Sequence, residues 1–330
     1  MPVIQEGSVN TAALIVPNVY VQILSPKIAY LNGVPTNILG IVGGAEWGPL
    51  NSPVTIASMT DFDKMFGKIQ TQDHDLGTNV AIAVLQGANN MRCVRVTDGT
   101  DAKAHADLVD TTSPAPLVGV TLTAKYSGKV GNHISASVSA GSSSTIAAPT
   151  YKLTIVRENY LSEIYDNIGG TGATLWQNIV NAVNLGISAR RGPSEIVVAS
   201  IGVSTATPAL LAVTLSGGLN GDSGLTTANI IGSDVSPRTG MYALRNINCN
   251  VAFLAGVVDN TSWLTQASFG MSEGIYMVLS GGAGEYLTID TAITNKKSVG
   301  LANYSAKLLL GDWHYFQDVE NNQIRLVSPQ

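Results

Sequence analysis

The sequence contains little charge. Only 12% of its 330 residues are Asp, Glu, Lys or Arg, which is about half of the roughly 25% usual in soluble proteins. A monomer is normally kept in solution by charged side chains on its surface. We therefore expect a neutral, polar surface, much of which is covered by other subunits.

Basic residues are too few and too scattered to form a nucleic-acid site. The net charge is −5, and the densest basic pairs are Arg190–Arg191 and Lys296–Lys297. A protein that follows a phosphate backbone carries a basic stripe or patch instead. Nucleic acid is therefore not an expected partner.

Cysteine is almost absent. Cys93 and Cys249 lie far apart and outside any C-x-x-C motif, which excludes a zinc finger and a disulfide framework and favours reduced, buried thiols. Residues 1–10 have no basic segment followed by an apolar run, so no signal peptide is expected. No apolar run approaches the ~18 residues of a membrane span. We expect a protein that matures in a cytoplasm and does not insert into a membrane.

One motif has the residues of a catalytic serine. Residues 270–274 fit G-x-S-x-G with Ser272 as nucleophile, and His314 with Asp290 or Asp312 would complete a triad. A nucleophile elbow places its serine between a strand and the following helix, whereas this motif follows a predicted helix and precedes a predicted strand. We expect a helix end here and keep a serine hydrolase at Ser272 as an alternative function.

The other candidate binding residues form no recognisable site. The glycine-rich segments 215–221 and 280–284 lack both G-K-[ST] and the context of G-x-G-x-x-G. The histidines are dispersed without the spacing of metal ligands: His74, His105, His133 and His314. We expect no catalytic, metal-binding or cofactor-binding residues, no cofactor and no enzymatic activity.

Residues 16–53 organise the chain. Residues 19–24 form a strand-like run between Pro17 and Pro26, which suits an edge strand, and no hairpin partner lies nearby in sequence. A free strand near a terminus can add to the sheet of another chain. The residues predicted to form this intersubunit strand are Val16, Val19, Tyr20, Val21, Gln22 and Ile23. Pro26, Gly33 and Pro35 are predicted hinge or turn residues.

The apolar run 38–44 does not alternate, which predicts a strand buried on both faces. A strand at 53–57, a helix at 58–67 with Thr60 as N-cap, a helix at 78–86 and a strand at 91–96 follow. This order predicts a βαβ unit in a largely parallel sheet.

A change of composition predicts a linker over 98–116, which we expect to act as a hinge. We also expect residues 24–32 to act as a hinge. Short alternating strands then indicate a small antiparallel β module. Its predicted elements are strands at 118–124, 134–139 and 151–156, a helix at 174–189 and a strand at 195–200.

Alternation of helices and strands resumes after residue 240. The expected elements are helices at 240–245, 261–274 and 287–295, and strands at 250–258, 275–279, 298–310, 313–318 and 324–327. The predicted fold is a multi-domain α/β protein, with a discontinuous α/β core, an inserted small antiparallel β domain and an extended N-terminal arm. The expected parts are the arm at 1–24, core at 25–107, β-rich module at 117–214 and core again at 215–330.

The chain resembles the sheath proteins of contractile phage tails and related injection machines. The resemblance rests on motifs in a shared order over nearly the whole chain: 17–23, 33–53, 60–67, 91–96, 122–134, 215–221, 240–245 and 311–318. It implies a subtilisin-like architecture for the α/β core, without protease activity. Family members continue past the position of Pro329, so we expect a C-terminally truncated chain.

The resemblance also implies a function. Subunits would form hexameric rings stacked around a tail tube, joined by terminal strands that add to neighbouring sheets, and contraction would drive the tube through a cell envelope by rigid-body rotation. The implied partners are other copies of the chain, the tail tube protein, and baseplate and tail terminator proteins. The implied location is the tail sheath of a virion, assembled in the host bacterial cytoplasm. Another tail or baseplate structural protein is a further alternative.

Overall fold

The computed structural model describes residues 3–4, 21–22, 37–158, 160, 162–188, 191–285, 288–311 and 313–330. The chain divides into two units, residues 1–36 and residues 37–330. In the first unit, strands β1 (Val3–Ile4) and β2 (Val21–Gln22) pair in parallel, with Val3 opposite Val21.

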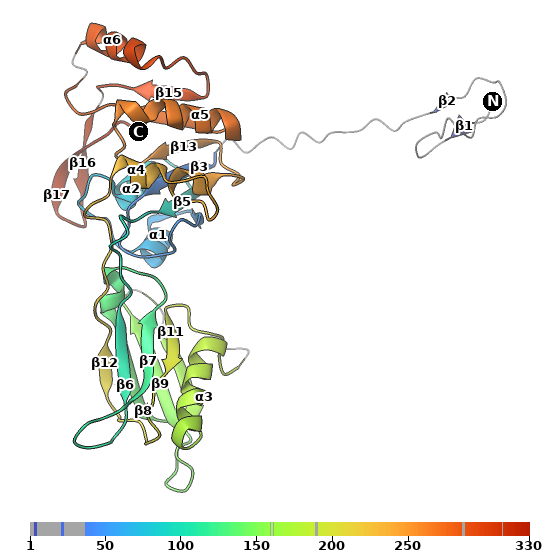
Figure 1. The fold of residues 1–330 in the computed structure, drawn as a ribbon, viewed down its shortest axis with the longest axis vertical. Helices are drawn as coiled ribbons and strands as arrows, with labels where there is room; N and C mark the ends of the chain where they lie inside the picture. The colour runs from blue at the N-terminus through green and yellow to red at the C-terminus, as the bar shows by residue number, and fades with distance from the viewer. Residues whose placement is uncertain are drawn as a thin grey trace. The chain divides into compact units, whose positions relative to one another are not determined.

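A six-stranded sheet is the centre of the core lobe, the name used here for residues 37–97 and 222–330 (Figure 1). In spatial order its strands are β15 (Ala306–Leu309), β14 (Tyr276–Ser280), β13 (Val251–Leu254), β3 (Leu39–Gly43), β5 (Met91–Arg95) and β4 (Val54–Ile56). Neighbouring strands run parallel except β4, which is antiparallel to β5. The predicted buried strand at 38–44 and the βαβ unit that leads to β5 are confirmed.

Helices cover both faces of this sheet. The helical elements are α1 (Met59–Phe66), α2 (Leu76–Leu85), α4 (Thr227–Ile231), α5 (Trp263–Glu273), α6 (Ile289–Val299) and the 3-10 turns η3 (Gly240–Leu244) and η4 (Asn260–Ser262). Ile41 packs in the cluster of α1 and α2, whereas its neighbour Val42 packs in the cluster of η3 and α5. Strand β3 is buried on both faces for this reason.

Several predicted boundaries in the core lobe were wrong. Helix α1 is capped by Ser58, whose Oγ accepts from the Asp61 N–H at 3.2 Å, and the predicted cap Thr60 lies inside the helix. The helix predicted at 240–245 is a 3-10 turn. Helix α6 continues to Val299, because Gly300 with φ 70° is its first left-handed residue, so only β15 remains of the strand predicted over 298–310.

The β lobe, defined as residues 102–219, contains two antiparallel sheets (Figure 1). One has the order β11 (Val197–Ile201), β7 (Val118–Ala124) and β6 (His105–Val109). The other has the order β10 (Glu163–Ile168), β9 (Tyr151–Arg157), β8 (Ile134–Ala140) and β12 (Ala212–Thr214). A 3-10 turn, η2 (Lys129–His133), precedes β8. The predicted antiparallel strands at 118–124, 134–139 and 151–156 are confirmed.

Helix α3 (Gly172–Leu185) packs against β10 and β11, the outer strands of the two sheets. Trp176 belongs to this helix, is fully buried, and packs against the backbone of Gly119. The side-chain amide of Asn184 donates to the Ala199 carbonyl at 2.8 Å and accepts from the Ala199 N–H at 2.9 Å. This pair occupies backbone groups of β11 that would otherwise be free for another strand.

The segment predicted as a linker, 98–116, contains strand β6. The side chain of Leu108 is buried, and the strand pairs with β7 through residues 105–109. The expected boundary at residue 107 therefore falls inside this strand. Strands β10 and β12 were also not predicted, and the division of residues 37–330 into separate parts of a core and a module stays a prediction.

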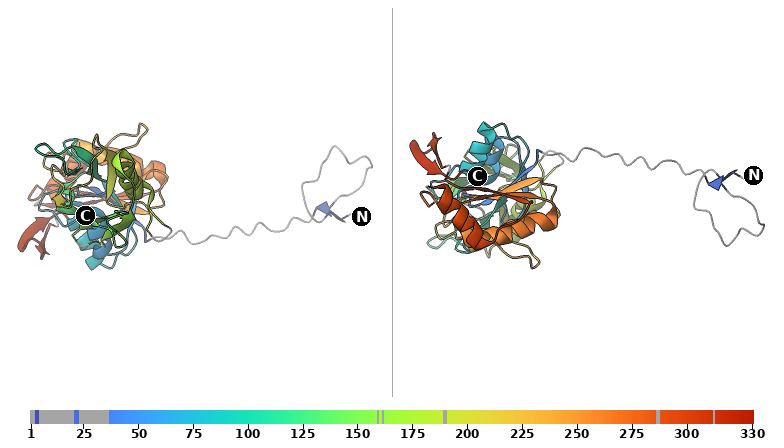
Figure 2. Two further views of the ribbon diagram at one scale, coloured as in Figure 1. Left: turned by 90° about the horizontal axis from the view of Figure 1, so that it is seen from below. Right: turned by 90° about the horizontal axis from the view of Figure 1, so that it is seen from above.

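A two-stranded antiparallel hairpin follows the core sheet: β16 (His314–Asp318) and β17 (Gln323–Val327). Both strands confirm predictions. The hairpin lies at the periphery of the 37–330 unit in both views of Figure 2. Among the described residues, no helix is long and apolar enough to cross a membrane.

Candidate assembly surface

Apolar side chains from both strands attach the hairpin β16–β17 to the core lobe. Phe316 projects from β16 and is buried in a small cluster with Ile69 and Ala81, to which Val327 of β17 also packs. Because a two-stranded hairpin is marginally stable alone, this contact is needed to hold it in place.

Polar groups on the same inner face complete the attachment. The Arg325 guanidinium pairs with the Asp318 carboxylate, Nη2 to Oδ2 3.0 Å, and donates to the Thr78 hydroxyl on α2. The turn contributes Glu320, whose Oε2 accepts from the Ile69 N–H at 2.9 Å, so bonds form at both ends of the hairpin. The inner face is thus fixed by packing and hydrogen bonds together.

This network continues to a buried carboxyl group. Asp75, the N-cap of α2, accepts from both the N–H and the hydroxyl of Thr78 at 2.6 Å. Burial raises the pKa of Asp75 to about 7, against the lowering effect of those two bonds. Its second oxygen, Oδ1, is buried and has no hydrogen-bond partner among the described residues. The carboxyl group therefore titrates near neutral pH directly beneath the hairpin.

The outer face of the hairpin is apolar and exposed. Tyr315 lies opposite Leu326 and Gln317 opposite Ile324, so these side chains share one face. The exposed fractions are 78% for Tyr315, 70% for Ile324 and 46% for Leu326. None of these residues carries a charge that would discourage another strand from pairing with the hairpin.

The edges of the hairpin are also open. The sheet consists of β16 and β17, and in the described part of the chain neither strand has a second neighbour. Each outer edge therefore presents backbone N–H and C=O groups to a further strand. A strand added at one of these edges would form main-chain hydrogen bonds with the hairpin, and alternate side chains of the added strand would extend its apolar face. The hairpin is the candidate assembly surface.

The predicted intersubunit strand lies mostly outside the described residues. Val21 and Gln22 form β2 and pair in parallel with Val3 and Ile4, so this part of the segment has a local partner. The other predicted residues are outside the described part: Val16, Val19, Tyr20, Ile23, Pro26, Gly33 and Pro35. Their roles as strand, hinge or turn stay predictions.

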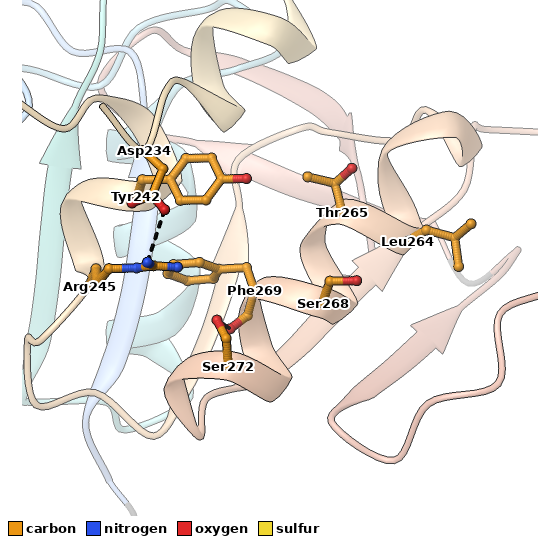
Figure 3. A pocket seen from close by; sticks show the side chains of 8 residues that line it. All are labelled: Asp234, Tyr242, Arg245, Leu264, Thr265, Ser268, Phe269 and Ser272. Carbon is orange, nitrogen blue, oxygen red and sulfur yellow. Dashed lines mark hydrogen bonds and ion pairs between the residues drawn. The ribbon is translucent and has the colours of Figure 1, made fainter. Parts of the chain in front are cut away.

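Ser272 lies in the last turn of α5, before β14, which confirms the predicted order of helix then strand and is the reverse of a nucleophile elbow. Its hydroxyl donates to the Phe269 carbonyl at 2.9 Å. Ser272 is one of the residues that line a surface cavity of about 400 Å³. Figure 3 shows these side chains, among them Arg245, which pairs with Asp234, Nη1 to Oδ2 2.9 Å. The residues that line this cavity include no histidine that could take the serine proton.

The other triad candidates lie elsewhere. His314 is on β16 and Asp290 is in the first turn of α6, while Asp312 lies outside the described residues. Among the residues that the structure describes, no group of three or more His, Cys, Asp or Glu could hold a metal ion. Nδ1 of His74 lies 2.9 Å from the Ala255 carbonyl oxygen, within hydrogen-bond distance.

The fold has counterparts among solved structures. A sheath tail protein from Desulfitobacterium hafniense matches 94% of this chain with a TM-score of 0.51 and 16% identity. A sheath tail protein from Listeria innocua matches 88% of this chain and 68% of its own length, with a TM-score of 0.49 and 15% identity. This chain spans 59% of the length of the Desulfitobacterium protein. No family model and no curated protein matches the sequence. At this level of identity, the likeness is one of fold.

Proposed function

We propose that this chain is a structural subunit of a contractile tail sheath, which polymerises around a tail tube. The observation that carries the proposal is the β16–β17 hairpin, which has two open edges and an exposed, uncharged face. The fold likeness to a sheath tail protein and the low charge of the chain support it. In this proposal the core lobe is the subtilisin-like part of the sheath fold, and the β lobe is its inserted module.

The occupant we propose for the hairpin is residues 16–23 of a second copy. That segment is apolar and rich in β-branched and aromatic residues, which suits a strand added to a sheet. The ~13 residues between it and the core lobe span up to about 45 Å when extended. This is long enough for the strand to leave its own subunit and reach a neighbour. Subunits joined in this way can rotate as rigid bodies without separating.

The partners in this proposal are other copies of the chain, a tail tube protein, and baseplate and tail terminator proteins. Helix α6 offers a second exposed surface. In the described part of the chain it has no buried residue, and Ile289 and Ile293 are exposed on successive turns beside Lys296 and Lys297. An apolar stripe on a helix with so little packing is expected to be covered in an assembly.

Deletion of residues 1–24 tests the proposal. Negative-stain microscopy should show rings or tubes for the full chain and none for the deletion variant, which should keep the circular dichroism spectrum of the full chain. Val21→Pro should weaken assembly because it removes a backbone donor. Val21→Thr, which keeps that donor, is the matched control. Tubes formed by the deletion variant, or no assembly of the full chain, would overturn the proposal.

A further inference from the structure

The core lobe and the β lobe are joined by two stretches of chain, residues 97–103 and 216–222. Side chains also cross this junction. The Asn132 amide donates to the Gly218 carbonyl at 3.0 Å, and its oxygen accepts from the Gly218 N–H at 2.7 Å. The side-chain oxygen of Asn220 accepts from the Lys129 N–H at 2.8 Å. Residues 216–222 are therefore tied to η2 by more than the covalent chain.

Arg95 is the central side chain of the junction. It is the last residue of β5 and its exposed fraction is 0%. It donates to the core-lobe carbonyls of Ala45 and Gly48 at 2.9 Å each. On the other side it donates to the carbonyl of Ser127 at 2.8 Å and to that of Asn220 at 2.9 Å. One guanidinium therefore binds the loop after β3, the β-lobe loop that precedes η2, and the second connection, residues 216–222.

The hydrogen-bond partners of Arg95 are backbone carbonyls and, at 3.4 Å, the Ser127 hydroxyl, and the carboxylates of Asp101, Asp222 and Glu46 also favour its charged form. Burial lowers the pKa of Arg95 to about 10, and the guanidinium stays charged at neutral pH. A buried charge that loses its hydrogen-bond partners is strongly destabilising. Opening of the junction breaks the bonds of Arg95 to the Ser127 and Asn220 carbonyls, which opposes separation of the lobes.

Arg157 makes the reciprocal contact, from the β lobe to the core lobe. It is the last residue of β9, is 3% exposed, and donates from Nη2 to the Lys64 carbonyl at 2.7 Å. That carbonyl is in the last turn of α1, where backbone oxygens lack a helical partner and a cation is favoured. The Tyr160 ring lies 4.6 Å from the guanidinium carbon.

Apolar packing fixes the same junction. Trp47 follows β3 in the core lobe, yet it is buried in the hydrophobic cluster of the β lobe and contacts Tyr126 edge to face, with ring centroids 5.6 Å apart. Gly128 has φ 134°, and a Cβ placed there would lie 1.9 Å from the Glu46 carbonyl oxygen. The two backbones approach more closely than any side chain at Gly128 would allow.

We propose that Arg95 and Arg157 are reciprocal clamps that hold the core lobe and the β lobe as one rigid body. This places any flexible joint outside residues 97–103 and 216–222, in contrast to the hinge expected over 98–116. The inference is independent of the proposed function, because it uses only contacts within residues 37–330.

The test is a distance distribution between spin labels, measured on the full chain by double electron–electron resonance. Labels at Leu85→Cys on α2 and Gln177→Cys on α3 occupy exposed positions in the two lobes, while native Cys93 and Cys249 are buried. The clamped structure predicts a single narrow distribution. Arg95→Met should broaden it, and Arg157→Met should broaden it less because fewer bonds are lost.

Arg92→Met is the matched control, since Arg92 is on the same strand and bonds only within β5 and the residue before it. It should leave the distribution narrow. If Arg95→Met does not fold, native-state hydrogen exchange of the unsubstituted chain decides: the most protected amides of the two lobes should exchange with one common free energy of opening. A broad distribution in the unsubstituted chain, an unchanged one in a folded Arg95→Met variant, or two separate opening free energies would overturn the proposal.

Discussion

Asp318 and Arg325 pair across the β16–β17 hairpin, with Oδ2 of Asp318 3.0 Å from Nη2 of Arg325 and the Asp318 side chain 0% exposed. Asp318 also accepts from the N–H and side-chain amide of Asn321 in the turn. The same partners also bind the core lobe, because Arg325 donates to the Thr78 hydroxyl and the Asn321 amide donates to the Ile69 carbonyl at 3.0 Å. The pair therefore links closure of the hairpin to its attachment.

Replacing one member of this pair should destabilise the chain. Asp318→Ala leaves the Arg325 charge largely buried without its partner, and such changes cost about 3–5 kcal/mol. Urea denaturation should show the loss, and hydrogen exchange should show faster exchange of amides 314–327. Asp290→Asn, at an exposed site on α6, is the control and should change stability by less than about 1 kcal/mol. Equal stability of the two variants would contradict this account.

Asp75 should make stability depend on pH. Its folded-state pKa, about 7, is above the unfolded value of 3.8, so the folded state holds the proton more tightly. The resulting stabilisation is complete below pH ~4 and is lost as the pH rises through ~7. Asp75→Asn, which can still cap α2, should therefore reduce the loss of stability between pH 5 and pH 8, measured by urea denaturation. The same loss in both proteins would show that Asp75 is not responsible.

Gly119 should not tolerate a methyl group. A Cβ there would lie 2.3 Å from ring carbons of the buried Trp176. Gly119→Ala should therefore lower the free energy of unfolding by about 1–3 kcal/mol or more, as overpacking does. Gly192→Ala is the control, because no atom lies within 4 Å of the added Cβ. A thermal scan that gives both variants the same midpoint would contradict the packing described for α3.

Ser272 should not react as a nucleophile. Its hydroxyl donates to the Phe269 carbonyl, and the adjacent cavity includes no histidine. We expect a fluorophosphonate probe to leave the chain unlabelled, and Ser272→Ala to change nothing in that assay. Labelling that disappears in Ser272→Ala would restore the hydrolase alternative.

Local patterns predicted most of the elements, because alternation and apolar runs reflect which face of a strand or helix is buried. The strand 118–124 was predicted with its observed bounds. Strand β6 was missed because Leu108 is its only fully buried side chain, and the surrounding residues have the composition of a linker. Such a strand is specified by its pairing with β7, and no local signal records that pairing.

The contacts that fix the hairpin and the junction could not be predicted from local sequence patterns either. Both strands of the hairpin were predicted, but their attachment depends on Arg325 and Thr78, which are 247 residues apart. The partners of Arg95 are carbonyl oxygens, the farthest of them 125 residues away. Every residue has a carbonyl, so no residue type marks these partners in the sequence.

The central claim is that the N-terminal strand of one copy joins the hairpin of another, and intermolecular disulfide formation tests it most directly. Two variants, Gln22→Cys and Gln317→Cys, are mixed under mild oxidation. Gln317 is exposed on the outer face of the hairpin, whereas native Cys93 and Cys249 are buried. Their mixture should give a disulfide-linked dimer containing one copy of each variant, and the same mixture with Tyr315→Asp added to the second variant should not. A mixture that stays monomeric while the chain still forms tubes would contradict the account.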